Sequence, residues 1–339
     1  MLRTRLTDQY ELDVPFVCAG MGFVGMPPLV AAVSNAGGMG TLGASPLPPD
    51  ALRAMIGAIR SMTSQPFGVN FITRFTEDAH IDVCLEERVP VVSFHWDDPP
   101  ERYISRLRDG GVKVWMQVGS VQMAREVTQV GIDAVIVQGS EAGGHVRGEA
   151  STLVLVPAVV DAIAPVPVLA AGGIADGRAA AAALALGAEA VWVGTRMAAT
   201  QEANSHDEHK RRLVAATEAD TVVTTLFGPE WPDAPARVLR NRVVDEWIGR
   251  EREVVYSEDS PQTIGRTLMG AEEYVMPKFS ALPPTPETTG DFEEMMLLGG
   301  ESAGLVKEIR PAGEIVREMM EEAQRIITER LCPMTAESP

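Results

Sequence analysis

Cysteine is scarce in this sequence, and the three that occur lie far apart. Cys18, Cys84 and Cys332 form no spacing that is typical of a metal site, and so low and odd a count does not build a disulfide framework. We therefore expect no bound metal and no disulfide bonds, as in a reducing cytoplasm. The N-terminus lacks the apolar core of a signal peptide, which also predicts a cytoplasmic location.

Positive charge and long apolar runs are also in short supply. The 29 Lys and Arg residues face 47 Asp and Glu residues, so the formal net charge is −18. Such an acidic surface repels nucleic acid and anionic lipid, and no run of about 20 apolar residues is present to span a bilayer. We expect a small-molecule substrate, no nucleic acid and no membrane, and a homo-oligomer stays open. Backbone amides can still bind a phosphate locally.

Low-complexity tracts are absent, and 45% hydrophobic with 22% charged residues is an ordinary globular composition. The first 200 residues repeat one rhythm, in which a short apolar run is followed by a turn and a helical stretch. The candidate strands begin at Pro15, Met39, Phe67, Pro90, Val112, Asp133, Val166 and Ala190. Strands that alternate with helices pair in parallel, and continuous apolar runs indicate strands covered on both faces.

Eight such units predict an α/β fold, a (β/α)8 TIM barrel, which needs roughly 250 of the 339 residues. A doubly wound open sheet is the alternative, but no G-x-G-x-x-G follows an early strand. The rhythm breaks after Thr200. We therefore assign residues 1–204 and 306–339 to the barrel and residues 205–305 to an inserted lid or subdomain over its mouth. Further expected elements are helices over 206–216, over 241–250 and from Pro311, and a strand over 221–226.

Two glycine turns follow the seventh and eighth candidate strands. The first is Gly172-Gly173 and the second is Gly194-Thr195, and each comes directly before a helical stretch. Glycine lets a ligand approach the backbone closely, and the loops after strands seven and eight are the usual phosphate site of a barrel. We predict that these four residues bind a phosphate group. The alternative is that the glycines serve turn geometry alone.

One histidine follows two glycines at the end of the sixth candidate strand. The segment runs from Gln138 to His145 and reads QGSEAGGH, with Gly143 and Gly144 directly before the histidine. The glycines allow close packing against a planar ligand, and an imidazole can accept or hold a proton near neutral pH. The alternative is a loop histidine that caps local carbonyls.

QGSEAGGH resembles the flavin-binding, histidine-bearing segment of the nitronate monooxygenase family, also called 2-nitropropane dioxygenases, which are FMN-binding TIM-barrel oxidoreductases. Other segments agree in order, namely Cys18-Ala19-Gly20-Met21, Gly68-Val69-Asn70-Phe71 and the two glycine turns. The resemblance covers nearly the whole chain. It implies FMN as the cofactor, with its phosphate at the glycine turns.

The resemblance also implies a role for each matching position. His145 would be the catalytic base or the group that binds the nitro oxygens of the substrate. Gln117 stands where some relatives have a lysine near the flavin, and a neutral amide stabilises an anionic reduced flavin less than an ammonium does. The expected FMN contacts are Ala19, Gly20, Met21, Asn70, Gln117, Gln138, Gly143, Gly144, Gly172, Gly173, Gly194 and Thr195.

The implied activity is oxidation of alkyl nitronates or nitroalkanes with O2 to a carbonyl compound and nitrite. Flavin-dependent enoyl-acyl-carrier-protein reductases and some NAD(P)H:quinone reductases carry similar segments, so an NAD(P)H-dependent reductase of quinones or enoyl thioesters is the alternative. A barrel that binds a phosphate ligand without redox chemistry is a third reading. A relative of inosine-monophosphate dehydrogenase would need a catalytic cysteine after the sixth strand, and none occurs between Cys84 and Cys332.

A histidine, three tryptophans and a cysteine are further candidates for the pocket or the core. His95 ends the fourth candidate strand beside Trp96, so it is a candidate pocket residue. We expect Trp96, Trp115 and Trp231 to fill the core or the lid rather than to bind substrate. Cys18 reads as a small buried hydrophobe.

Overall fold

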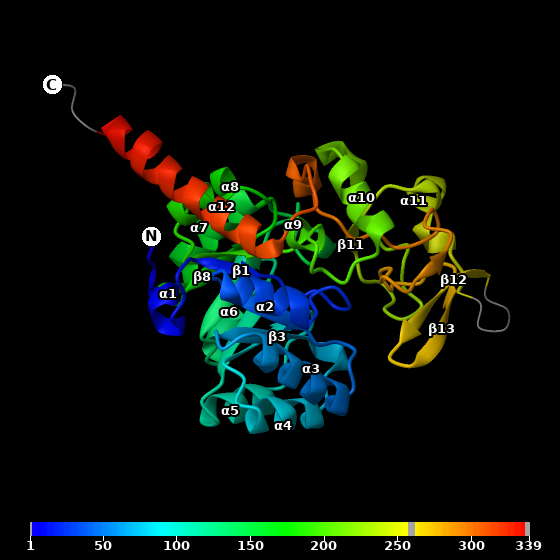
Figure 1. The fold of residues 1–339 in the computed structure, drawn as a ribbon, viewed down its shortest axis with the longest axis horizontal. Helices are drawn as coiled ribbons and strands as arrows, with labels where there is room; N and C mark the ends of the chain where they lie inside the picture. The colour runs from blue at the N-terminus through cyan, green and yellow to red at the C-terminus, as the bar shows by residue number, and fades with distance from the viewer. Residues whose placement is uncertain (1, 257–261, 336–339) are drawn as a thin grey trace.

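The eight parallel strands form a closed barrel in the computed structural model, which describes residues 2–256 and 262–335 (Figure 1). The strands are β1 (Phe16–Cys18), β2 (Gly40–Gly43), β3 (Phe67–Ile72), β4 (Val91–His95), β5 (Lys113–Val118), β6 (Ala134–Gln138), β8 (Val168–Ala171) and β9 (Ala190–Val193). Their order is β1-β9-β8-β6-β5-β4-β3-β2, and a parallel bridge between Val17 and Met39 closes the ring. The predicted TIM barrel is confirmed.

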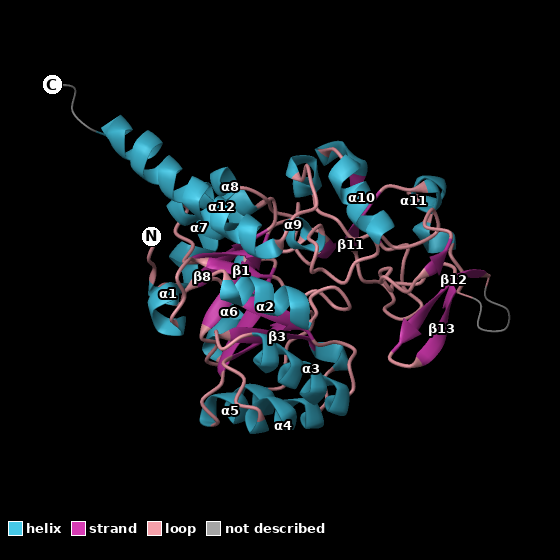
Figure 2. Ribbon diagram, in the orientation of Figure 1, coloured by secondary structure: helices cyan, strands magenta, loops and turns pink. Residues whose placement is uncertain are grey.

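Helices surround this barrel, and the last one lies across its outside (Figure 2). The helices are α1 (Arg5–Tyr10), α2 (Pro27–Asn35), α3 (Pro49–Met62), α4 (Asp78–Glu86), α5 (Glu101–Asp109), α6 (Val121–Gln129), α7 (Thr152–Ile163), α8 (Gly177–Ala185), α9 (Thr195–Ala198), α10 (Asp207–Ala215), α11 (Arg242–Trp247) and α12 (Ala312–Arg325). Shorter turns are η1 (Thr73–Phe75), η2 (Glu218–Asp220), η3 (Glu251–Glu253), η4 (Glu301–Leu305), η5 (Ile326–Leu331) and η6 (Cys332–Thr335). No helix within residues 2–256 and 262–335 is long and apolar enough to cross a membrane.

Local sequence explains several boundaries. The Asp176 side chain accepts a hydrogen bond from the amide of Ala179, so it caps the start of α8 as expected. Helix α12 begins after Pro311, and Ile315 and Met319 on one of its faces are buried in the main core against α2 and α8. This helix therefore docks on the barrel, as its apolar spacing predicted.

Side chains fill the barrel interior at the N-terminal ends of the strands. Trp115 lies inside the barrel with no exposed surface, and its Nε1 donates a 2.8 Å hydrogen bond to the hydroxyl of Tyr10 on α1. Helix α1, which was not predicted, thus covers the N-terminal ends of the strands. This leaves the C-terminal ends of the strands open for a ligand.

Residues 207–256 and 262–305 form smaller elements beside that open end, as Figure 1 shows. Strands β10 (Thr221–Thr224) and β11 (Ala236–Leu239) form one antiparallel sheet with β7 (Gly144–His145), and β13 (Glu272–Pro277), β12 (Thr263–Met269) and β14 (Thr289–Gly290) form another. A separate apolar cluster that includes Phe227, Val243 and Met296 supports them. The division of the chain into a barrel (1–204 and 306–339) and an inserted lid or subdomain (205–305) stays our proposal. Residues 257–261 of the lid and 336–339 of the barrel lie outside the described residues.

The elements of this region differ from the prediction in detail. Strand β10 ends at Thr224 rather than at 226, and helix α11 stops at Trp247 because Gly249 adopts a left-handed φ of 81°. The hairpin of β12 and β13 was not predicted. Most of its side chains are exposed, so the sequence shows no continuous apolar run there.

Candidate functional site

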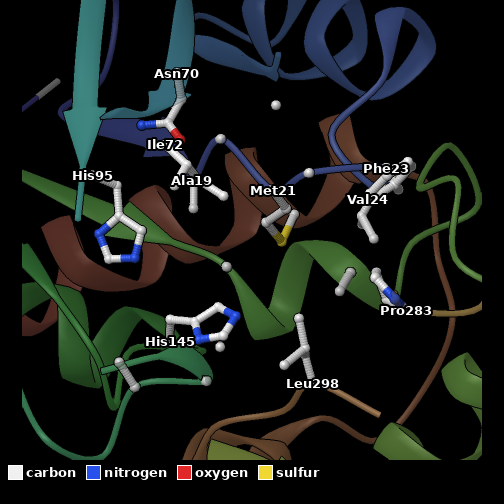
Figure 3. Close-up of a pocket in the computed structure, with 18 of the residues that line it drawn as sticks. Ala19, Met21, Phe23, Val24, Asn70, Ile72, His95, His145, Pro283 and Leu298 are labelled. Atoms are coloured by element: carbon white, nitrogen blue, oxygen red, sulfur yellow. The ribbon is translucent and has the colours of Figure 1, made fainter. Parts of the chain in front are cut away.

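A cavity of about 390 Å³ opens at the C-terminal ends of the barrel strands, and residues 209–302 supply part of its wall (Figure 3). All the residues that the sequence nominated for cofactor binding or catalysis line it. They are Ala19, Gly20, Met21, Asn70, Gln117, Gln138, Gly143, Gly144, His145, Gly172, Gly173, Gly194 and Thr195. The structure therefore brings segments from along the whole barrel to one place, while the role of each residue remains a prediction.

The two glycine turns form adjacent corners of this cavity. Gly172 and Gly173 have φ values of 101° and 72°, a left-handed backbone that side chains disfavour. A Cβ added to Gly194 would lie 3.6 Å from Ala19 Cβ and 3.8 Å from Met21 Sδ, so it would enter the space between the corner and the first-strand turn. Both corners therefore present backbone, rather than side chains, to the cavity.

Other parts of the wall are held by close packing and hydrogen bonds. A Cβ on Gly20 would lie 2.1 Å from Asn70 Cβ, so only glycine fits beside Asn70. The Asn70 Nδ2 donates a 2.9 Å hydrogen bond to Ser93 Oγ, and Gln138 Nε2 donates a 3.0 Å bond to the carbonyl of His145. These contacts fix the side chains that face the cavity.

His145 lies among aromatic side chains and is partly exposed to the cavity. Its ring centroid is 3.8 Å from that of Trp231 and 5.7 Å from that of Trp96. Burial lowers the pKa of His145 to about 4, although hydrogen bonding to the backbone of Ala234 and Pro235 opposes the shift. The imidazole is therefore neutral at pH 7 and can accept a proton, and its buried Nδ1 has no partner among the described residues.

His95, the candidate from the fourth strand, also lines the cavity. Burial, followed by the charges of His145 and Arg147, lowers the pKa of His95 to about 3. The next two residues, Trp96 and Asp97, have φ values of 58° and 53°, which is uncommon and strained for residues other than glycine. This backbone turn places Trp96 edge-on to the His95 ring.

The sequence missed several residues of the cavity wall. Trp231 is buried and lines the cavity, and Trp115 fills the core; that Trp231 does not bind substrate stays a prediction. Glu230 holds the Trp231 loop by accepting hydrogen bonds from the Tyr274 hydroxyl at 3.0 Å and from the Ser280 hydroxyl at 2.6 Å. No motif announces these residues. The paired glycines at 299 and 300 are a weak sequence signal for this part of the wall. The Gly300 amide donates a 3.0 Å hydrogen bond to Thr195 Oγ1, which lines the cavity.

The polar groups of the wall are neutral, apart from one carboxylate. Among the described residues, no Lys or Arg lines the cavity, and the one carboxylate that does, Glu230, already accepts three hydrogen bonds. Within residues 2–256 and 262–335, no group of three His, Cys, Asp or Glu side chains could hold a metal ion. The cavity therefore suits an organic ligand that is bound through backbone amides and neutral side chains.

His209 on α10 is a fully buried histidine of the wall and sets a testable dependence of stability on pH. It is 1% exposed, its Nε2 donates to the Leu298 carbonyl at 2.9 Å, and burial lowers its pKa to about 4. The unfolded pKa is about 6.5, so the stability that this residue contributes is complete above pH 6.5 and is lost as the pH falls toward 4. We expect this one residue to cost about 2 kcal/mol between pH 7 and pH 5.

The variant His209→Gln keeps a donor for Leu298 but cannot titrate. Urea unfolding at pH 7 and pH 5 should therefore show a smaller acid loss in the variant than in the wild type. Between pH 7 and pH 9 the two proteins should change equally, which controls for general effects of the substitution. An equal acid loss in both proteins would contradict the assignment.

Comparison with known proteins agrees with this geometry. The sequence profile of one family, nitronate monooxygenase, matches residues 3–80 and 71–322. The chain is 41% identical over 249 residues to a Mycobacterium tuberculosis protein, (3aS,4S,5R,7aS)-5-hydroxy-7a-methyl-1-oxo-octahydro-1H-indene-4-carboxyl-CoA dehydrogenase, which covers 72% of this chain and 68% of the relative. It is 34% identical to a probable nitronate monooxygenase of Staphylococcus aureus, over 74% of this chain and 82% of the relative.

Among solved structures, FabK from Thermotoga maritima is 38% identical, with a TM-score of 0.79 over 98% of this chain and 100% of its own. A nitroalkane oxidase from Streptomyces ansochromogenes is 31% identical, with a TM-score of 0.78 over 96% of this chain and 99% of its own. Both similarities therefore extend over nearly the whole chain.

Proposed function

The chain belongs to the nitronate monooxygenase family of oxidoreductases, and from this we propose that it is an FMN-dependent enzyme that oxidises alkyl nitronates and nitroalkanes with O2. One observation carries the proposal. The neutral imidazole of His145 faces the same cavity as the two glycine corners, Gly172-Gly173 and Gly194-Thr195. This chemistry needs a proton acceptor and a site for the cofactor phosphate in the same cavity.

The residues present fit FMN. The corners offer backbone that only glycine adopts readily, and the open space beside Gly194 leads toward Ala19 and Met21. Gly143 packs so tightly on the Gly299-Gly300 turn that a Cβ would lie 2.4 Å from the Gly300 amide nitrogen. This contact keeps the cavity wall flat where a planar ring would lie.

Bound FMN would accept electrons from the substrate and pass them to O2, which yields a carbonyl compound and nitrite. The chain itself would supply orientation and proton transfer. With a nitroalkane, His145 takes the proton from the carbon beside the nitro group. Trp231, held by Glu230, covers the imidazole and keeps water away from it.

A second candidate function is oxidoreduction of a carboxylic CoA thioester with a nicotinamide nucleotide as the co-substrate. The 41% identity to a carboxyl-CoA dehydrogenase favours it. A proton beside a thioester carbonyl is also acidic, so His145 could serve either substrate. The third reading, a barrel that binds a phosphate ligand without redox chemistry, has no such support, because the matching family and the relatives named above are oxidoreductases.

Anaerobic mixing of the purified holoenzyme separates these functions. We expect propionate-3-nitronate or nitroethane to bleach the flavin absorbance and to give nitrite when O2 is admitted, while NADH and NADPH leave the oxidised spectrum unchanged. Bleaching by NADH or NADPH alone would support the thioester or quinone reductases instead. A colourless protein without FMN after gentle purification would contradict both flavin proposals.

A further inference from the structure

Two imidazoles project into one space at the mouth of the barrel, as Figure 3 shows for His95 and His145. They reach it from different elements, since His95 ends β4 and His145 lies in β7, which pairs with β11. The Nδ1 atom of each ring is buried and has no hydrogen-bond partner among the described residues. Unsatisfied buried polar atoms are rare in native proteins, so this pair calls for a ligand.

We propose that His95 is a second substrate-contacting residue, which donates a hydrogen bond to one oxygen of a planar oxyanion that lies beside His145. This inference rests on the proposed function insofar as a nitronate is such an anion. It adds a residue and a mode of binding that the flavin chemistry alone does not require.

The composition of the wall supports this assignment. An anion in this cavity meets no Lys or Arg side chain, so its charge has to be balanced by neutral donors. The side chains of Asn70 and Gln138 already donate to Ser93 and to the His145 carbonyl. The buried Nδ1 of His95 has no partner among the described residues, so this ring can donate to an anion that lies beside His145. Burial keeps both rings neutral at pH 7, and each neutral ring carries one N–H.

The surrounding residues hold the two rings in place. Trp96 contacts both, with ring centroids 5.8 Å from His95 and 5.7 Å from His145. Its left-handed backbone is strained, and such strain is typical of functional sites. Arg147 lies 5.8 Å from the centre of the Trp96 ring, and Arg74 lies 5.9 Å from that of Trp231. Two positive charges therefore lie next to these aromatic rings without lining the cavity, so they can attract an anion at longer range.

The test measures binding of an unreactive planar anion, sodium propionate, to the holoenzyme. Binding is followed by tryptophan fluorescence and by the visible flavin spectrum. We expect His95→Leu to raise the Kd for propionate about ten-fold or more, since it loses a hydrogen bond to a charged group. The variant His95→Gln keeps an N–H donor and should recover most of the affinity. The control His206→Asn, which alters the cap of α10, should bind as the wild type does.

A second measurement needs no variant. In protein labelled with ¹⁵N-histidine, propionate should shift the imidazole resonances of both His95 and His145. Propionate that binds His95→Leu as tightly as wild type, shifts only one ring, or does not bind at all would overturn the inference. If His95-dependent binding is found but nitronates do not reduce the flavin, the proposed function fails while the two-histidine site stands.

Discussion

Replacing His145 with glutamine is expected to lower kcat/KM for nitroethane by about 10² to 10⁴-fold, the usual contribution of a positioned general base. Glutamine retains hydrogen-bonding groups but cannot accept the proton from the carbon beside the nitro group. The wild-type imidazole can, because burial lowers its pKa to about 4 and keeps it neutral at pH 7. Steady-state rates of nitrite formation measure the loss.

The substrate itself provides the sharpest control for this prediction. A preformed nitronate has already lost its proton, so His145→Gln should lose much less activity with propionate-3-nitronate than with nitroethane. The variant should also keep its FMN, and His80→Gln, on α4 and outside the cavity wall, should keep both activities. Equal losses on the two substrates would limit His145 to substrate binding, and full activity on nitroethane would remove it from the mechanism.

The barrel could be predicted from sequence because each of its strands is buried on both faces. A run such as Val135–Val137 has no exposed residue, so it reads as a continuous apolar segment. Strands β12 and β13 could not be found in this way. In β12 only Ile264, Gly265 and Thr267 are buried, and such a mixed pattern is also typical of a loop.

The same contrast applies to the site. The two glycine corners and His145 follow strands at fixed positions, and the C-terminal ends of barrel strands always meet at one face. The positions of Trp231 and His209 depend instead on how residues 205–305 fold back over that face, which no local pattern specifies. His95 could be predicted only in part. Its place at the C-terminal end of a strand indicated that it lies near the site, but only the structure shows that it faces His145.

Substitution of Gly194 tests the proposed cofactor site without disturbing the backbone. We expect Gly194→Val to raise the Kd for FMN about 100-fold, the upper end of what overpacking of a fitted site costs. The φ of Gly194 is −104°, so a side chain causes no left-handed strain there. Its Cβ would make only ordinary contacts with Ala19 and Met21, yet the two methyl groups of valine would extend into the space proposed for the flavin.

A graded series makes this prediction specific to the cavity. Gly194→Ala should weaken FMN binding only slightly, and Gly194→Val strongly, as measured by titrating the apoprotein with FMN and following flavin fluorescence. Gly57→Val on the exposed face of α3, where a Cβ meets nothing within 4 Å, is the matched control and should bind FMN as the wild type does. Both valine variants should unfold in one transition near the wild-type temperature. If Gly194→Val retains full affinity for FMN while Gly57→Val behaves as expected, the flavin does not lie between this corner and the first-strand turn. The proposed electron acceptor, FMN, would then not lie beside His145, the proposed proton acceptor.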